Sequence, residues 1–197
     1  EILYEDIHVI YGALQVLPLH WLRLIGIPAM TAQLLLVALC AVLCLYFTYE
    51  ILGYLRMPIK EKNAILILSA ILFFPYYLGI EGFRYVYTTW FFIRIVQLSS
   101  TDNNLLLQLI VTVSAVLFSV LFSQEDGLCF SVALIIFYIL DGVIKKKWIN
   151  LLYVFFIIVS IGTLIWLLPG MFNAVIYMLG GASSFPYVPS FHLVVLF

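Results

Sequence analysis

Residues 29–55, with the sequence AMTAQLLLVALCAVLCLYFTYEILGYL, decide the fold class of this chain. The only charged residue in this stretch is Glu50, which lies close to its end. Helical residues rise by about 1.5 Å each, so the stretch is long enough to cross a bilayer hydrocarbon core of about 30 Å. We therefore expect residues 29–55 to form a transmembrane helix.

The composition of the whole chain agrees with a membrane protein. Hydrophobic residues make up 65 % of the sequence and charged residues only 10 %, and the mean hydropathy is +1.18. A soluble domain of this size would present far more charge to water. The net charge of −1 argues against a nucleic-acid partner, which would favour a basic surface.

Six apolar stretches are separated by charged, proline-containing or glycine-containing breaks. They are residues 29–55, 64–79, 86–98, 105–122, 128–144 and 148–168. Before them, residues 10–27 mix apolar residues with Pro18, His20 and Arg23, which is typical of a helix lying in the membrane interface. We expect an all-α integral membrane protein, a polytopic helical bundle with about six transmembrane helices plus an interfacial amphipathic helix in an outer loop.

This pattern predicts a single transmembrane domain over residues 1–197. Residues 1–28 are expected to form an outer loop with the interfacial helix, residues 29–168 the six spans, and residues 169–197 an outer segment. Because the sequence opens on a polar stretch, we also expect the chain to be a fragment of a longer protein.

The distribution of basic residues predicts the orientation of these spans. Six of the nine basic residues fall in two alternate loops, at Arg56, Lys60 and Lys62 and at residues 145–147. Cytoplasmic loops of membrane proteins carry an excess of Lys and Arg. We therefore expect these loops to be cytoplasmic, and the opening segment and the C-terminal tail to be extracytoplasmic. A bacterial inner or plasma membrane is the expected location.

The loops expected outside carry polar groups in three places. These are Glu5 with Asp6 and His8, Glu81 with Arg84, and Glu125 with Asp126. A carboxylate can act as a general base or a metal ligand, and a guanidinium pairs bidentately with phosphate. Loops at a membrane surface are also polar simply because they are hydrated. For Arg84 we favour a functional role, because a cation at the end of a span usually has a partner.

Several short motifs occur in order along the first part of the chain. They are a tyrosine-plus-acid element at Tyr4, Glu5 and Asp6, then YGAL at residues 11–14, then LIG at residues 24–26, then a basic loop at residues 56–62, then Pro75 late in a span, then Arg84. This order, over roughly residues 3–130, resembles the GT-C glycosyltransferases, which are multi-span enzymes that use polyprenyl- or dolichyl-phosphate sugars. The similar members include protein mannosyltransferases and lipid A aminoarabinose transferases. Ala13 stands where that family usually has proline.

The resemblance implies an inverting transferase that moves a sugar from an isoprenoid-phosphate carrier to a lipid, glycan or protein acceptor on the outer face. It implies catalytic roles for Asp6 and Glu5, and substrate-binding roles for Arg84, His8, Tyr11 and Glu81. The family's main catalytic acid lies just after a first span, which would precede Glu1 and is missing here, so Asp6 would hold a supporting position. The sequence requires no cofactor, and a divalent metal is left open. Membrane lipid is an expected partner, and nucleic acid is not.

Two other classes of protein stay open from the sequence. A polysaccharide polymerase or ligase-like membrane enzyme would also combine many spans with outward arginines, but it would favour a large central outer loop. A transporter without chemistry would favour inverted repeats with paired Gly- or Pro-broken spans, and the sequence shows no convincing internal repeat.

Overall fold

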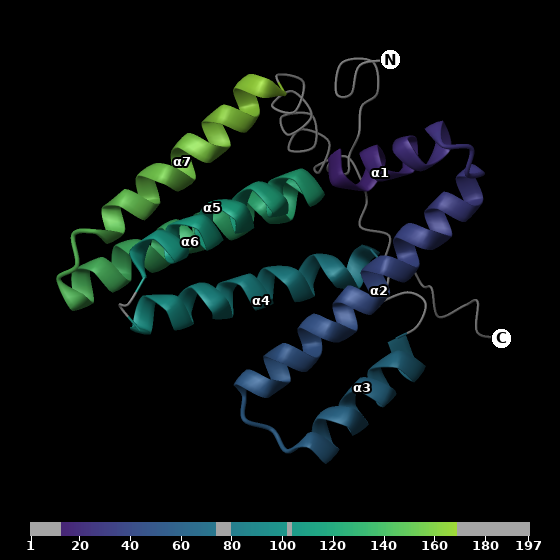
Figure 1. The fold of residues 1–197 in the computed structure, drawn as a ribbon. Coiled ribbons are helices and arrows are strands. Elements are labelled where there is room, and N and C mark those ends of the chain that lie inside the picture. Colours follow the sequence, from purple (N-terminus) through teal and green to yellow (C-terminus); the bar gives the residue numbers. More distant parts are fainter. Residues whose placement is uncertain (1–12, 74–79, 102–103, 169–197) are drawn as a thin grey trace, which may run out of the picture.

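The computed structural model describes residues 13–73, 80–101 and 104–168, and every regular element in these ranges is an α-helix (Figure 1). The seven helices are α1 (Ala13–Leu24), α2 (Ala29–Tyr54), α3 (Ile59–Phe73), α4 (Ile80–Thr101), α5 (Leu105–Phe122), α6 (Gln124–Lys145) and α7 (Asn150–Leu167). The predicted all-α class is therefore confirmed for the described residues.

Helices α4 to α7 lie side by side, α2 packs against α4, and α3 packs against α2 (Figure 1). Helix α1 contacts α2 and α5 and lies across one end of this arrangement. We call this end, where α5 finishes and α6 begins, the α1 end. The opposite end, where α6 finishes at Lys145, is called the lysine end. The two basic segments, with Arg56, Lys60 and Lys62 and with residues 145–147, both lie at the lysine end.

Four of the described helices, α2, α5, α6 and α7, are long and apolar enough to cross a membrane. These four indicate an integral membrane protein. The predicted count of about six spans is not confirmed, because α3 has only 15 residues and begins with the charged sequence IKEK, and α4 carries Glu81, Arg84 and Arg94. Helix α1 occupies most of the stretch predicted to form an interfacial helix.

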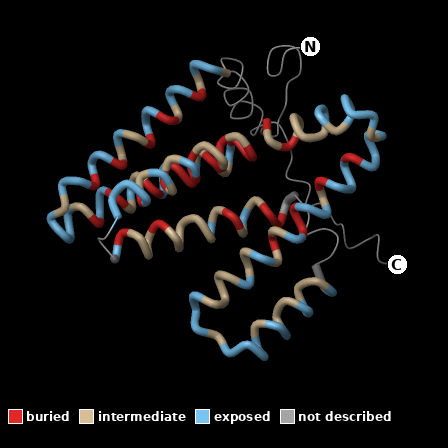
Figure 2. The backbone as a smooth tube through the Cα atoms, viewed as in Figure 1, coloured by how far each residue is buried: buried red, intermediate tan, exposed pale blue. Residues whose placement is uncertain are grey.

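The outer faces of the helices agree with a lipid environment. Large apolar side chains point outward, including Trp166 and Ile144, which are 79 % and 77 % exposed. In Figure 2 the buried positions face the neighbouring helices, whereas exposed positions cover the outside. Helix α2 buries small residues such as Ala32, Cys40 and Cys44. Small residues let helices approach closely, and close packing drives helix association in lipid, where the hydrophobic effect does not.

The prediction of a polar loop at residues 123–127 is wrong. Helix α5 ends at Phe122 and α6 begins at Gln124, so Ser123 alone joins them, in an extended conformation. A Cβ atom at Gly127 would lie 2.4 Å from Val120 Cα, so glycine is required for the close contact between the two helices. Polarity alone does not distinguish a loop from a first helical turn, and acidic residues are favourable near a helix N-terminus.

One further boundary differs from the expected one, whereas α5 has the expected bounds. Arg84 lies inside α4, which begins at Ile80, and not in a loop before a span. Helix α5 is capped by Asn104, whose side-chain oxygen accepts a hydrogen bond of 3.0 Å from Leu107 N–H. A side-chain cap of this kind satisfies one of the backbone donors that a helix start leaves unpaired.

Candidate functional site

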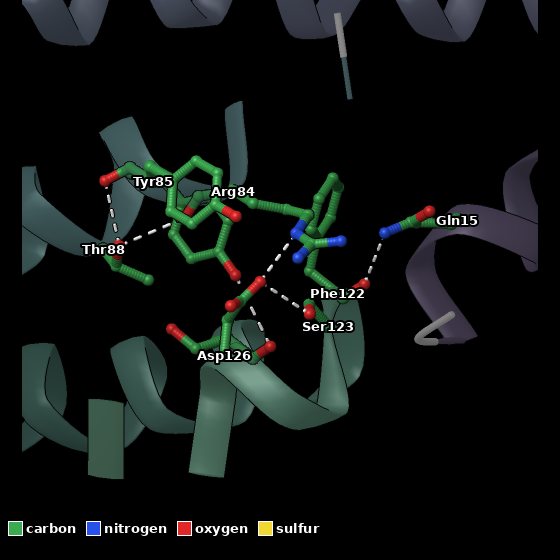
Figure 3. A network of polar contacts seen from close by, with 9 residues as sticks. Gln15, Arg84, Tyr85, Thr88, Phe122, Ser123 and Asp126 are labelled. Carbon is green, nitrogen blue, oxygen red and sulfur yellow. Dashed lines mark hydrogen bonds and ion pairs between the residues drawn. The ribbon is translucent and has the colours of Figure 1, made fainter. Parts of the chain in front are cut away.

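Helices α1, α4, α5 and α6 bring polar side chains together at the α1 end (Figure 3). Arg84 Nε lies 2.6 Å from Asp126 Oδ2, and the two side chains are only 15 % and 20 % exposed. Ser123 Oγ donates a hydrogen bond of 2.8 Å to the same Oδ2 atom. Because little water reaches this ion pair, its attraction is screened less than that of a surface pair.

Helix α1 is attached to this cluster through Gln15. Its Nε2 donates a hydrogen bond of 2.8 Å to the carbonyl oxygen of Phe122, and the Gln15 side chain is buried. The last four carbonyl groups of a helix have no partner within that helix. Gln15 therefore satisfies a carbonyl at the end of α5 and holds α1 over the turn at Ser123.

Local contacts also position the guanidinium of Arg84. Its Cζ atom lies 5.6 Å from the centroid of the Tyr85 ring, within the range of a cation–π interaction. One turn later, Thr88 Oγ1 donates hydrogen bonds to the carbonyl oxygens of Arg84 and Tyr85, at 3.1 and 2.9 Å. These bonds fix the first turns of α4, from which the Arg84 side chain extends toward Asp126 (Figure 3).

An aromatic cluster lies beneath the polar groups. Ring centroids are 5.0 Å apart for Phe83 and Tyr87, 5.1 Å for Tyr87 and Phe118, and 5.1 Å for Phe83 and Phe122. Phe83, Tyr87 and Phe122 are buried. The Arg84–Asp126 pair thus lies next to a packed cluster of aromatic side chains, which joins α4 to α5.

Gln124 is the most unusual polar residue near this site. Its side chain is 1 % exposed, yet within the described part of the chain neither of its amide atoms has a hydrogen-bond partner. Buried amides are almost always paired, because an unpaired one costs about 1–3 kcal/mol. A residue of this kind at the first position of α6, two residues before Asp126, is a candidate for binding a polar ligand.

The structure brings together two of the three polar groups predicted to face outward. Arg84 and Asp126 form the ion pair, whereas Glu125 is exposed. Glu81 lies in the first turn of α4, but its side chain is outside the described part of the structure. Glu5, Asp6, His8 and Tyr11 lie outside the described residues altogether, so their predicted roles stay predictions.

Sequence reasoning missed three residues of the site, Gln15, Ser123 and Gln124. Gln15 had a usable signal, since it is the only polar residue in the run ALQVLPL and a lone polar residue there needs a buried partner. For Ser123 and Gln124 the polar sequence predicts a loop and gives no signal of burial. Within the described ranges, no group of three or more His, Cys, Asp or Glu side chains could hold a metal ion.

Comparisons of the chain with known protein families, with curated proteins and with solved structures found no match.

Proposed function

We propose that this protein is an inverting membrane glycosyltransferase, which moves a sugar from a polyprenyl-phosphate carrier to an acceptor at the α1 end of the helices. One observation carries the proposal: a half-buried Arg84–Asp126 pair, built from two separate polar groups, lies at the α1 end. Its position at the end of apolar helices is where a lipid-linked phosphate would meet the protein.

Arg84 is the residue that binds the carrier phosphate. A guanidinium carries five N–H donors in a planar fork, so it can bind more than one anionic oxygen at the same time. Asp126 and Ser123 are positioning residues, because they hold the guanidinium in place. The polyprenyl chain would lie along the apolar faces of the neighbouring helices.

The transfer needs one base and one cation. A carboxylate accepts the proton of the acceptor hydroxyl while the acceptor oxygen attacks the anomeric carbon, and Asp6 and Glu5 are proposed to line this site in a supporting position. The bond from that carbon to the phosphate oxygen breaks on the opposite face, and the phosphate leaves with the electron pair. Arg84 stabilises the charge that develops on the phosphate. The phosphate is already a good leaving group, so no acid catalyst is needed. Because the acceptor attacks on the face opposite the phosphate, the anomeric configuration is inverted.

We place the α1 end outside the cytoplasm and the protein in a bacterial inner or plasma membrane. The support for this orientation is the gathering of six basic residues at the lysine end, since cytoplasmic segments are enriched in Lys and Arg. The acceptor, whether lipid, glycan or protein, would then approach from the extracytoplasmic side.

The test is transfer from a labelled polyprenyl-phosphate sugar by the full-length protein in lipid vesicles. We expect Arg84→Gln to lower kcat/KM by about 100-fold or more, as removal of a preorganised donor to a developing anion does. Asp126→Asn is expected to cause a smaller loss. Arg23→Gln is the matched control, because Arg23 is an exposed cation on α1. Full transfer by Arg84→Gln would refute the assignment of Arg84.

A polysaccharide polymerase or ligase-like enzyme is the second candidate. Arg84 lies inside helix α4 at the α1 end, as an outward-facing arginine of such an enzyme would. The same assay separates the two candidates when a second donor carries a preformed glycan chain. Transfer of single sugars supports the first candidate, and transfer of the preformed chain supports the second. The absence of any transfer would favour a transporter without chemistry.

A further inference from the structure

A cavity of about 740 Å³ lies between α4 and α5, on the side of the bundle nearer the lysine end. We call it the α4–α5 cavity. Its wall on α4 runs from Trp90 to Ser100, and its wall on α5 runs from Leu107 to Ser114. Trp90 and Ser114 lie near the middle of their helices. The cavity therefore extends from the region of the lysine end toward the middle of the bundle.

The α5 wall of the cavity is open to the outside of the helices. Leu107 and Ile110 are 43 % and 52 % exposed, and Ser114 is exposed as well. Helix α5 is long and apolar enough to cross a membrane, so its exposed side chains would face lipid. A ligand would reach the cavity from the bilayer, and it must therefore be soluble in lipid.

Arg94 is the charged residue of the α4–α5 cavity, and its charge is balanced from α2. Its Nη2 atom lies 2.6 Å from Glu50 Oε2, and its Nη1 donates a hydrogen bond of 3.2 Å to Gln97 Oε1. An ionisable side chain at the level of membrane spans is costly and commonly marks a functional site. An anionic ligand would be repelled by Glu50, and a cationic one by Arg94. The cavity therefore suits a neutral ligand.

Hydrogen-bond donors lie on both walls of the cavity, and none of its described lining residues is acidic. The two bonds of Arg94 use two of the five N–H donors of a guanidinium. Trp90 Nε1 is buried and has no hydrogen-bond partner within the described ranges, which costs stability unless a ligand supplies an acceptor. Ser114 adds a hydroxyl on the α5 wall. A matching ligand carries acceptor oxygens on two opposite edges.

These properties occur together in a quinone. It is neutral and soluble in lipid, it has carbonyl oxygens on opposite edges of its ring, and it carries an apolar chain. An ester lipid also has carbonyl oxygens, but they lie together at its glycerol end. Apolar walls with a few placed polar groups are usual for sites that bind small molecules.

We propose that the α4–α5 cavity binds a membrane quinone. One carbonyl oxygen accepts hydrogen bonds from Arg94 and Trp90, and the other accepts one from Ser114. The apolar chain lies against Leu107 and Ile110. The Arg84–Asp126 pair is at the other end of α4, and the proposal does not depend on the glycosyltransferase function.

The test uses tryptophan fluorescence, which quinones quench at short range. The sequence has four tryptophans, and three of them, Trp21, Trp148 and Trp166, are exposed and can be replaced by phenylalanine. In the full chain that keeps Trp90 alone, reconstituted in nanodiscs, we expect quenching by decylubiquinone to saturate. The matched control keeps Trp166 alone. Its quenching should rise in proportion to the quinone dissolved in the lipid, because Trp166 lies on α7 and does not line the cavity.

Substitutions in the protein that keeps Trp90 then test the individual contacts. Ser114→Ala should weaken quinone binding by about fivefold, as loss of one neutral hydrogen bond does. The double variant Glu50→Gln with Arg94→Gln should weaken it by about tenfold or more, because a charged donor is lost while two amides can still join α2 to α4. The matched control is Asp141→Asn with Lys145→Gln. It removes another ion pair at the lysine end that does not line the cavity, so quinone affinity should be unchanged. Circular dichroism checks the folding of each variant.

The proposal is overturned by any of four results. Quenching of Trp90 that does not saturate would mean that the cavity holds no quinone. Equal affinities in the two double variants would show that Arg94 does not bind the ligand. Recovery of fluorescence on addition of dioctanoylglycerol would indicate a site for ester lipids. Recovery on addition of decanoate would indicate a site for anionic lipids.

Discussion

Gly127 offers the sharpest test of how α5 and α6 pack. In Gly127→Ala the new Cβ would lie 2.4 Å from Val120 Cα and Val120 N, where carbon atoms at rest stand about 3.5–4.0 Å apart. The atoms in the way belong to the backbone, so no side chain can rotate aside. Because Ser123 alone joins the two helices, they can separate only by distorting the turn next to Asp126, which pairs with Arg84 of α4.

The expected loss follows from two opposing contributions. Overpacking a well-packed contact costs about 1–3 kcal/mol, and the upper half of that range applies where backbone must move. Replacing glycine by alanine inside a helix gains about 1 kcal/mol. Gly127→Ala should therefore lower the free energy of unfolding by about 1–2 kcal/mol. Gly162→Ala in α7 is the matched control, because its new Cβ would meet no atom within 4 Å. It receives the same helix contribution without the overpacking.

The measurement is unfolding of both variants in mixed detergent micelles with increasing sodium dodecyl sulfate, followed by circular dichroism. The helix contribution cancels between the two variants, so their difference of about 2–3 kcal/mol isolates the contact with Val120. Equal unfolding free energies for Gly127→Ala and Gly162→Ala would refute the close packing of α5 and α6 and, with it, the one-residue turn.

Three further substitutions test other contacts. Gln15→Leu should speed hydrogen exchange in α1 by about tenfold, because the bond to the Phe122 carbonyl is worth about 1–2 kcal/mol when buried. Tyr138→Phe should lower the unfolding free energy by about 1–2 kcal/mol, because its hydroxyl lies 2.6 Å from Thr112 Oγ1 in the core. Asp141→Leu should lower it by about 2–3 kcal/mol, because the change removes a buried acceptor of three side chains.

Each of these predictions has its own control. Exchange in α7 should not change in Gln15→Leu, and unchanged exchange in α1 would show that the glutamine does not hold that helix. Tyr46→Phe affects a tyrosine that is 53 % exposed and should leave stability unchanged. Asp141→Asn keeps an acceptor for Ser99 and should cost less than Asp141→Leu. The reverse order would mean that the hydrogen bonds of Asp141 contribute little.

The helices themselves were largely predictable from the sequence. The stretch at residues 29–55 corresponds to α2, and the predicted span at residues 105–122 has the bounds of α5. Apolar length and charged or proline-containing breaks are local properties, so a single sequence displays them. The start of α6 was not predictable in this way. Its polar first turn looks like a loop unless the contact between Gly127 and Val120 is known.

The candidate site was predictable in its residue types but not in its pairing. The sequence indicated that Arg84 and Asp126 face the same side of the membrane, because the spans alternate in direction. Which acid meets Arg84 depends on the register between α4 and α6, and no local pattern encodes that register. Gln124 shows the same limit, since its burial depends on helices that are distant in sequence.

The single residue between α5 and α6 also bears on how the chain enters a membrane. Only one residue separates these two helices of membrane length, so there is no loop that would let one helix enter the membrane before the other. We therefore expect residues 105–145 to insert together as a helical hairpin. In the orientation proposed above, the turn with Glu125 and Asp126 has to cross the hydrocarbon during insertion, while the lysines at the end of α6 stay on the side of synthesis. Orientation of the hairpin is thus decided once for both helices. A charge-reversing change at residues 145–147 would affect α5 as much as α6.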